Sequence, residues 1–231
     1  MRRNLLGVLL GFALLGLFST AAAARCSVAA SSVSDGMTFS VVSDGSTRWI
    51  AAQGRITAES AARLEQFLAG LSDHPDTIVL HSPGGRLMGG LALGRAIRAA
   101  GLATRIGQAE TCTAHIEMEP GLCASSCAYA FLGGVDRELG DTGILGFHRI
   151  YPAAGQAHVS AAELADATLA AMLAVRRYLD EMGAHPHLAE LADRVGEHQL
   201  FIPRGPLLSV LGIETGPVIL AATEMAEPAR L

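Results

Sequence analysis

The 231-residue sequence contains no lysine, and all 17 of its basic residues are arginine. A phosphate-binding loop of the Gly-Lys-Ser/Thr kind is therefore excluded, and no G-x-G-x-x-G stretch is present for a dinucleotide. Aromatic residues are scarce at 5%, and charged residues make up only 17% of a chain with formal net charge −5. Because the excess charge is negative and forms no basic stripe, we expect no binding to nucleic acid. Half of the residues are hydrophobic, which is typical of an alanine- and leucine-rich α/β domain.

The first residues follow the order of a secretory signal peptide. Arg2 and Arg3 precede an uncharged apolar run over residues 5–18, and small residues then lead to an A-x-A site at residues 22–24. A membrane anchor is the competing interpretation, but a spanning helix needs about 20 apolar residues and this run is shorter. We therefore expect residues 1–24 to be removed and the mature chain to be periplasmic or secreted.

The rest of the chain, residues 25–231, predicts a single α/β domain. Short apolar or β-branched runs predict strands, and apolar residues at helical spacing predict helices. The expected strands cover residues 45–54, 77–81, 102–106 and 144–148, and the expected helices cover residues 57–71, 87–100, 124–132 and 161–182. This alternation implies a mainly parallel sheet with right-handed crossovers. The segment 107–122 is expected to be a surface loop, and the tail 218–231 gives no signal for either element.

Three short motifs point to acyl-transfer chemistry. Residues 82–85, Ser-Pro-Gly-Gly, follow a buried strand and precede a helix, so their backbone N–H groups can stabilise a phosphate or an oxyanion. Ser125 opens a helix of small residues, where a hydroxyl either caps the helix or is favoured as an alkoxide by the helix dipole. His148 ends an apolar strand, where open parallel sheets carry catalytic residues. Each motif alone also has a structural explanation: a tight turn, a helix cap and a hydrogen-bonding histidine.

Taken together, the motifs resemble the catalytic core of the Clp protease proteolytic subunit, a member of the crotonase superfamily. In that family Ser-Pro-Gly-Gly follows a buried strand, a nucleophile motif A-S-x-G-A begins a helix, and a histidine follows at a strand end. This chain has Ser-Pro-Gly-Gly at 82–85, Ala-Ser-Ser-Cys-Ala at 124–128, and then His148. The resemblance covers residues 49–213. It implies an α/β fold of the ClpP/crotonase type, a superhelix of repeated ββα units with a mainly parallel sheet.

The resemblance also assigns roles to residues. Ser125 is the implied nucleophile, His148 its general base, and the backbone N–H groups of Gly85 and Ser126 the oxyanion hole. The implied activity is a serine peptidase or related acyl hydrolase that acts on a peptide or protein without a cofactor. The superfamily commonly forms rings, so a homo-oligomer is expected. The absence of lysine excludes the Ser-Lys dyad of the related signal-peptide-peptidase branch.

The cysteine at position 127 makes the chain similar to periplasmic Clp-like proteins that carry C-A-S-x-C-A, which agrees with a signal peptide. The cytosolic protease works with an ATP-driven unfoldase. Because no ATP is expected beyond the inner membrane, we expect no ATPase partner here. Crotonase-type chemistry on a coenzyme A thioester is disfavoured for the same reason, since coenzyme A is a cytosolic metabolite.

The third triad member is where the sequence departs from the family. The family places an aspartate shortly before a phenylalanine-containing strand, and the matching position here is Gln199. Glu197 and Asp193 are nearby substitutes, but neither falls in register. A misoriented imidazole can cost orders of magnitude in rate. A second hypothesis therefore stays open: a catalytically silent protein that binds a peptide or partner protein in the same cleft.

Four cysteines in an exported chain can form disulfide bonds, because the compartment beyond the inner membrane is oxidising. Zinc is the competing interpretation, but no histidine stands at a zinc-finger offset from Cys123 and Cys127, so we expect no metal site. We predict that Cys112 pairs with Cys123 or Cys127 and holds the loop before Ser125. Cys26 then stays free or pairs elsewhere.

Overall fold

The computed structural model describes residues 36–43, 47–109, 118–140, 143–151, 160–196 and 199–216. The predicted signal peptide, the tail from residue 218, Cys26, Cys112 and Glu197 lie outside these ranges. Within the described ranges, no helix combines the length and apolar character needed to cross a bilayer.

The larger sheet has four strands in the order β1-β2-β3-β4. They are β1 (Thr38–Ser43), β2 (Arg48–Gln53), β3 (Thr77–His81) and β4 (Ala103–Ile106). The pairs β2–β3 and β3–β4 are parallel, as expected, with Ile50 opposite Ile78 and Leu80 opposite Ile106. The strand β1 was not predicted from the sequence; it pairs antiparallel with β2 and adds an edge strand to the parallel core.

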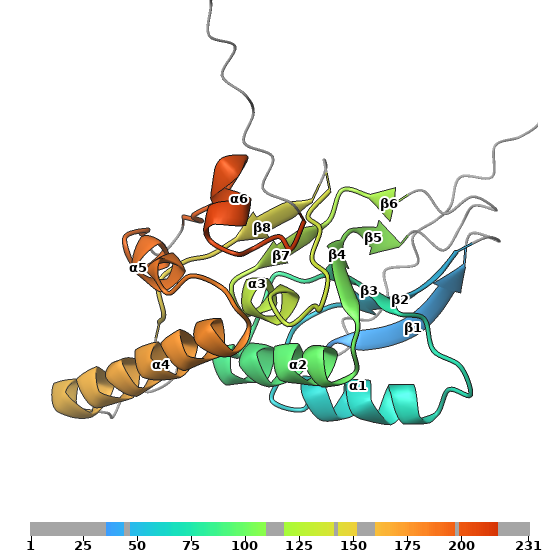
Figure 1. Cartoon of the computed structure of the whole chain (residues 1–231). Helices are drawn as coiled ribbons and strands as arrows, with labels where there is room; N and C mark the ends of the chain where they lie inside the picture. The colour runs from blue at the N-terminus through green and yellow to red at the C-terminus, as the bar shows by residue number, and fades with distance from the viewer. Residues whose placement is uncertain are drawn as a thin grey trace, which may run out of the picture.

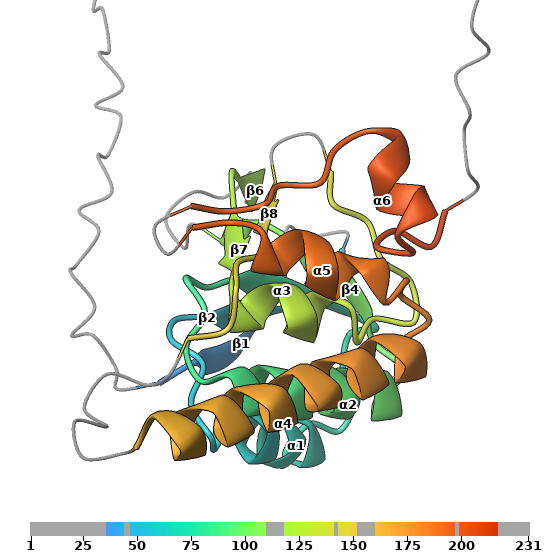
Figure 2. The same ribbon diagram turned by 90° about the vertical axis from the view of Figure 1, so that its left-hand side faces the viewer.

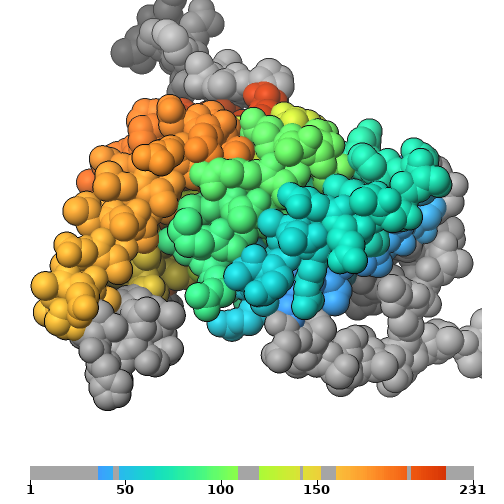
Figure 3. All heavy atoms as spheres, turned by 90° about the horizontal axis from the view of Figure 1, so that it is seen from below, coloured from blue at the N-terminus to red at the C-terminus, as the bar shows by residue number. Residues whose placement is uncertain are grey.

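Two helices cover one face of this sheet (Figure 1). They are α1 (Ser60–Ala69) and α2 (Leu87–Ala99), each inserted between two parallel strands. Viewed from that side, α1 and α2 lie next to each other, with α4 beyond α2 (Figure 3). Their apolar residues join the strands in one buried cluster, as Leu64 of α1 and Leu91 of α2 are fully buried. Burial of this face is what the helical spacing of the sequence predicts.

A second layer carries the motifs around Ser125. It consists of the two-stranded parallel sheet β7 (Leu122–Ala124) and β8 (Ile144–Gly146), the helix α3 (Ser126–Phe131), and the antiparallel pair β5 (Gln108–Ala109) and β6 (Met118–Glu119). The segment 107–122 is therefore not a simple surface loop, because it contributes β5, β6 and the start of β7. The expected helix 124–132 begins at Ser126, since Ala124 still belongs to β7. A bridge between Ser82 and Cys123 joins the end of β3 to β7.

The long helix α4 (Ala161–Glu181) confirms the expected helix 161–182 within a residue. It begins with a capping box, in which the Ser160 side chain accepts from the Glu163 N–H and the Glu163 carboxylate accepts from the Ser160 N–H. Its C-terminal half packs on the body of the molecule through Val175, Tyr178 and Leu179. Two short helices follow that the sequence analysis did not assign, α5 (His187–Asp193) and α6 (Pro206–Val210) (Figure 2).

The buried Arg137 forms hydrogen bonds with the main chain at the ends of α3 and α4 and after α6. Arg137 is 5% exposed, and in the described part of the chain its guanidinium donates to five main-chain carbonyls. The acceptors are the carbonyl groups of Leu132, Gly134, Met182, Gly212 and Ile213. Burial lowers the pKa of Arg137 to about 10, so the group is still charged at neutral pH. Its hydrogen bonds satisfy carbonyls at the ends of α3 and α4 that those helices leave unpaired.

Candidate active site

Ser125 lies in the sharp turn between β7 and α3. Its backbone has φ 60° and ψ −123°, and among the described residues it is the one non-glycine residue with positive φ. Holding a side chain in that region costs about 1–3 kcal/mol, which the surrounding structure must compensate. Its N–H donates to the Gly146 carbonyl at 2.8 Å, which ties the turn to β8. The Ser125 hydroxyl does not cap α3, so the capping alternative raised by the sequence does not apply.

Ser125 and its neighbour Ser126 differ in solvent exposure. Ser125 is partly exposed, whereas Ser126 is 1% exposed and faces the contact between α3 and α2. That contact is close, because a Cβ placed on Gly90 of α2 would lie 2.8 Å from the Ser126 Cβ. The exposed hydroxyl at this turn therefore belongs to Ser125, as the motif register predicts.

The glycine loop after β3 lies directly against the Ser125 turn. A Cβ on Gly84 would stand 2.7 Å from the Ser125 Cβ and 3.1 Å from the Ser126 nitrogen. Gly84 also has φ 95°, a conformation that favours glycine. The loop is fixed on its other side by Ile56, whose N–H donates to the Gly84 carbonyl at 2.9 Å. Two glycines are thus needed here because the main chain passes between Ile56 and the Ser125 turn.

The predicted oxyanion donors are both available. Within the described part of the chain, neither the Gly85 N–H nor the Ser126 N–H donates to a protein acceptor. The neighbouring Gly84 N–H, in contrast, donates to the Ser82 hydroxyl oxygen at 3.0 Å. The assignment of Gly85 and Ser126 as an oxyanion hole stays a prediction, and these N–H groups are free to serve it.

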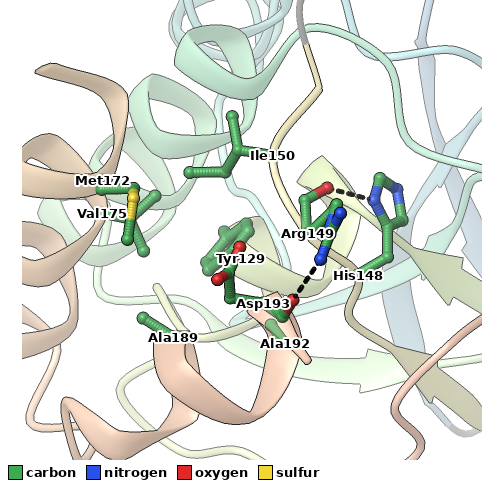
Figure 4. Close-up of a pocket in the computed structure, with 9 residues that line it drawn as sticks. All are labelled: Tyr129, His148, Arg149, Ile150, Met172, Val175, Ala189, Ala192 and Asp193. Atoms are coloured by element: carbon green, nitrogen blue, oxygen red, sulfur yellow. Dashed lines mark hydrogen bonds between the residues drawn. The ribbon is translucent and has the colours of Figure 1, made fainter. Parts of the chain in front are cut away.

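His148 follows β8, after the bridge between Phe147 and Phe201. Its Nδ1 lies 2.6 Å from the carbonyl oxygen of Arg149, and its ring stacks on Tyr151 with centroids 5.1 Å apart and planes 22° apart. Figure 4 shows the imidazole beside the Arg149 carbonyl. No hydrogen bond joins His148 to Ser125 in the described part of the chain.

Neither described candidate for a third triad residue, Gln199 or Asp193, forms a hydrogen bond or ion pair with His148. The Gln199 side-chain oxygen accepts from the Gly196 N–H at 3.4 Å instead. Asp193 is exposed, and its main-chain oxygen accepts from the Arg149 guanidinium at 3.1 Å. Glu197 lies outside the described residues. The carboxylate of a Ser-His-Asp triad has no counterpart among these side chains.

A small pocket that was not predicted from the sequence adjoins His148 (Figure 4). Its volume is about 20 Å³, and it is lined by Tyr129, His148, Arg149, Ile150, Met172, Val175, Ala189, Ala192 and Asp193. These residues come from α3, α4, α5 and the segment after β8, which meet only in the fold. Burial raises the pKa of the Tyr129 hydroxyl at this site, so it stays protonated. Room for about one water molecule is all this conformation offers.

The disulfide prediction was wrong in its pairing. Cys123 bonds to Cys127, with their Cα atoms 5.1 Å apart, so neither is available to Cys112. The turn at Ser125 folds the first turn of α3 back over the end of β7, which brings the two positions together. Both cysteines are fully buried, and the bond encloses Ser125 in a short loop. Among the described residues, no group of three or more His, Cys, Asp or Glu side chains is arranged to hold a metal ion.

No protein-family model matches the chain, and a comparison with curated proteins found no similar sequence. Solved structures do match. A variant of ClpP1 from Listeria monocytogenes has a TM-score of 0.50 at 17% identity, over 72% of this chain and 88% of that chain. Two variants of the 1510-N membrane-bound stomatin-specific protease also match at 16% identity, and each match covers 72% of this chain. One variant has a TM-score of 0.47 over 75% of its own chain. The other variant, in complex with a substrate peptide, has a TM-score of 0.48 over 71% of its own chain. The likeness to ClpP1 shows a shared ClpP-type fold and confirms the fold class predicted from the sequence.

Proposed function

We propose that this chain is an exported serine hydrolase, an ATP-independent peptidase that works through a Ser125 acyl-enzyme. The backbone of Ser125 carries the proposal. A non-glycine residue at positive φ, between a strand and a helix, matches the strained turn that presents a nucleophilic serine above a sheet. Strain of this kind persists where the position has a task that needs it.

In the proposed mechanism, His148 removes the proton from the Ser125 hydroxyl as the oxygen attacks the acyl carbon of the substrate. The negative charge that forms on the substrate oxygen is stabilised by the N–H groups of Gly85 and Ser126. The His148 imidazolium then gives its proton to the leaving amine, and the acyl-enzyme remains. Water, deprotonated by the same histidine, releases the acid and restores Ser125.

A peptide or protein as substrate is supported by the motifs at residues 82–85 and 124–128, which resemble those of the Clp protease proteolytic subunit. Export is supported by the buried Cys123–Cys127 bond, because disulfides persist mainly in oxidising compartments. A homo-oligomer is supported by α4, where Leu169 and Leu173 are more than half exposed on the surface of the described chain. Light scattering coupled to size exclusion tests the last point, with a monomer mass as the contrary result.

A catalytically silent binding protein is the second candidate. It is favoured by the missing hydrogen bond between Ser125 and His148 and by the absence of a described carboxylate at the histidine. Both features also occur in active enzymes before substrate binds, because catalytic hydrogen bonds are often long in the free state.

Labelling with a fluorophosphonate probe separates the two candidates. We expect the wild-type protein to label and Ser125→Ala to remain unlabelled. Ser126→Ala is the matched control. It removes a buried neighbouring hydroxyl that has no hydrogen-bond partner in the described part of the chain, and it keeps the main-chain N–H of residue 126. Equal labelling of wild type and Ser125→Ala, in protein shown to be folded by circular dichroism, would refute the serine hydrolase and favour the silent protein.

A further inference from the structure

We infer that two contacts within residues 148–151 orient His148: the main-chain carbonyl of Arg149 fixes its tautomer, and the ring of Tyr151 fixes its plane. No carboxylate among the described residues takes part. This inference rests on the proposed function, since it concerns the base of that reaction. It makes Tyr151 a positioning residue, and it assigns no role to Gln199, which occupies the position of the family's aspartate.

The tautomer follows from the hydrogen bond itself. A carbonyl oxygen can only accept, so the 2.6 Å contact between His148 Nδ1 and the Arg149 oxygen requires the proton on Nδ1. A neutral imidazole has one N–H, and its Nε2 then carries the lone pair that can accept the Ser125 proton. The aspartate of a serine triad imposes this same tautomer from the Nδ1 side.

One hydrogen bond to the next residue still leaves the ring plane to be set. The Tyr151 ring supplies this second contact, nearly parallel to the imidazole at 5.1 Å. The main chain on both sides is also held in place. Phe147 exchanges hydrogen bonds with Phe201 at 2.9 and 2.7 Å, and the Arg149 side chain donates to the Asp193 carbonyl. The four-residue segment 148–151 therefore contains both contacts that orient the base.

The two described candidates for the orienting residue form their hydrogen bonds elsewhere. The Gln199 amide oxygen accepts from the Gly196 N–H, and Asp193 reaches the segment only through its main-chain oxygen. A carbonyl carries partial rather than full negative charge, so it stabilises the imidazolium less than a carboxylate would. We therefore expect the correct tautomer together with slower acylation than a full triad gives.

Labelling rates test the positioning role. We expect Tyr151→Phe, which keeps the ring, to label within about twofold of wild type, and Tyr151→Ala to label at least about tenfold more slowly at an unchanged unfolding midpoint. Gln199→Ala and Asp193→Asn should stay within about twofold of wild type, because neither side chain forms a hydrogen bond or ion pair with His148. Equal rates for Tyr151→Ala and wild type overturn the role of Tyr151. A tenfold loss in Gln199→Ala or Asp193→Asn overturns the inference, because a side chain would then orient the base.

The tautomer is tested independently of activity. Long-range ¹H–¹⁵N spectra of the Ser125→Ala protein, recorded at alkaline pH where imidazole is neutral, report which nitrogen of His148 carries the proton. Nδ1–H supports the inference, and Nε2–H overturns it whatever the labelling shows. A wild-type protein that never labels, in spite of Nδ1–H, refutes the proposed function while the described orientation of His148 stands.

Discussion

The Cys123–Cys127 bond gives the sharpest test of how the strained turn is maintained. It joins the end of β7 to the first turn of α3 and encloses Ser125 at a sequence separation of 4. Loop-closure entropy for a loop this short corresponds to about 2 kcal/mol at 25 °C. The conformation of Ser125 costs about 1–3 kcal/mol. Because the two quantities are of similar size, the bond can offset the strain, and opening it should let the turn relax.

The perturbation is reduction of this single bond. In a background with Cys26→Ala and Cys112→Ala, the protein is unfolded, refolded with or without reductant, and compared by urea titration. Reduction keeps both sulfur atoms in the buried site, so the difference measures the covalent constraint without a cavity. We expect the free energy of unfolding to fall by about 2 kcal/mol. At a urea slope of about 2 kcal/mol/M, the midpoint should move down by about 1 M.

The same samples are then labelled with the fluorophosphonate probe below both midpoints. We expect the reduced form to label more slowly, because a relaxed Ser125 no longer faces the glycine loop at Gly84. Identical urea midpoints for the oxidised and reduced forms would refute the stabilising role of the bond. A lower midpoint with an unchanged labelling rate would show that the backbone alone maintains the turn.

Three further perturbations address the surroundings of the site. Gly84→Ala should abolish labelling, because its Cβ would lie 2.7 Å from the Ser125 Cβ; normal labelling would refute the close approach. Burial lowers the pKa of His81 below 6.5, so the folded state binds this proton more weakly than the unfolded chain does. The free energy of unfolding should therefore fall as pH drops below about 6.5, and it should fall less steeply in His81→Asn. Equal slopes for the two proteins would contradict this account. Arg137→Met should lower the unfolding free energy by about 3 kcal/mol or more, since the Gly212 and Ile213 carbonyls lose their donor and three further carbonyls keep only Arg98. Arg176→Ala at an exposed ion pair should cost under about 1 kcal/mol, and equal losses in urea titrations would be the contrary result.

Local patterns in the sequence were sufficient for most of the elements. The helices α2 and α4 and the strand β3 lie within a residue or two of their predicted bounds, because apolar spacing and β-branched runs are properties of neighbouring residues. The strand β1 was missed, since it is defined by pairing with β2 rather than by a strong pattern of its own. The end of β7 was predicted as helix because alanine favours helices, whereas Ala124 belongs to β7 through its pairing with Gly146 of β8.

For the candidate site, local motifs were enough to predict the order of the glycine pair, of Ser125 at a strand-to-helix turn, and of His148 after a strand. Spacing along the chain carries that information, since each motif is a local turn. Three features became known from the folded chain alone: the Cys123–Cys127 bond, the hydrogen bond from the Gly196 N–H to the Gln199 side chain, and the main-chain oxygen that accepts from the imidazole. These depend on the conformation of the Ser125 turn and on side-chain rotamers, and residue order does not specify either.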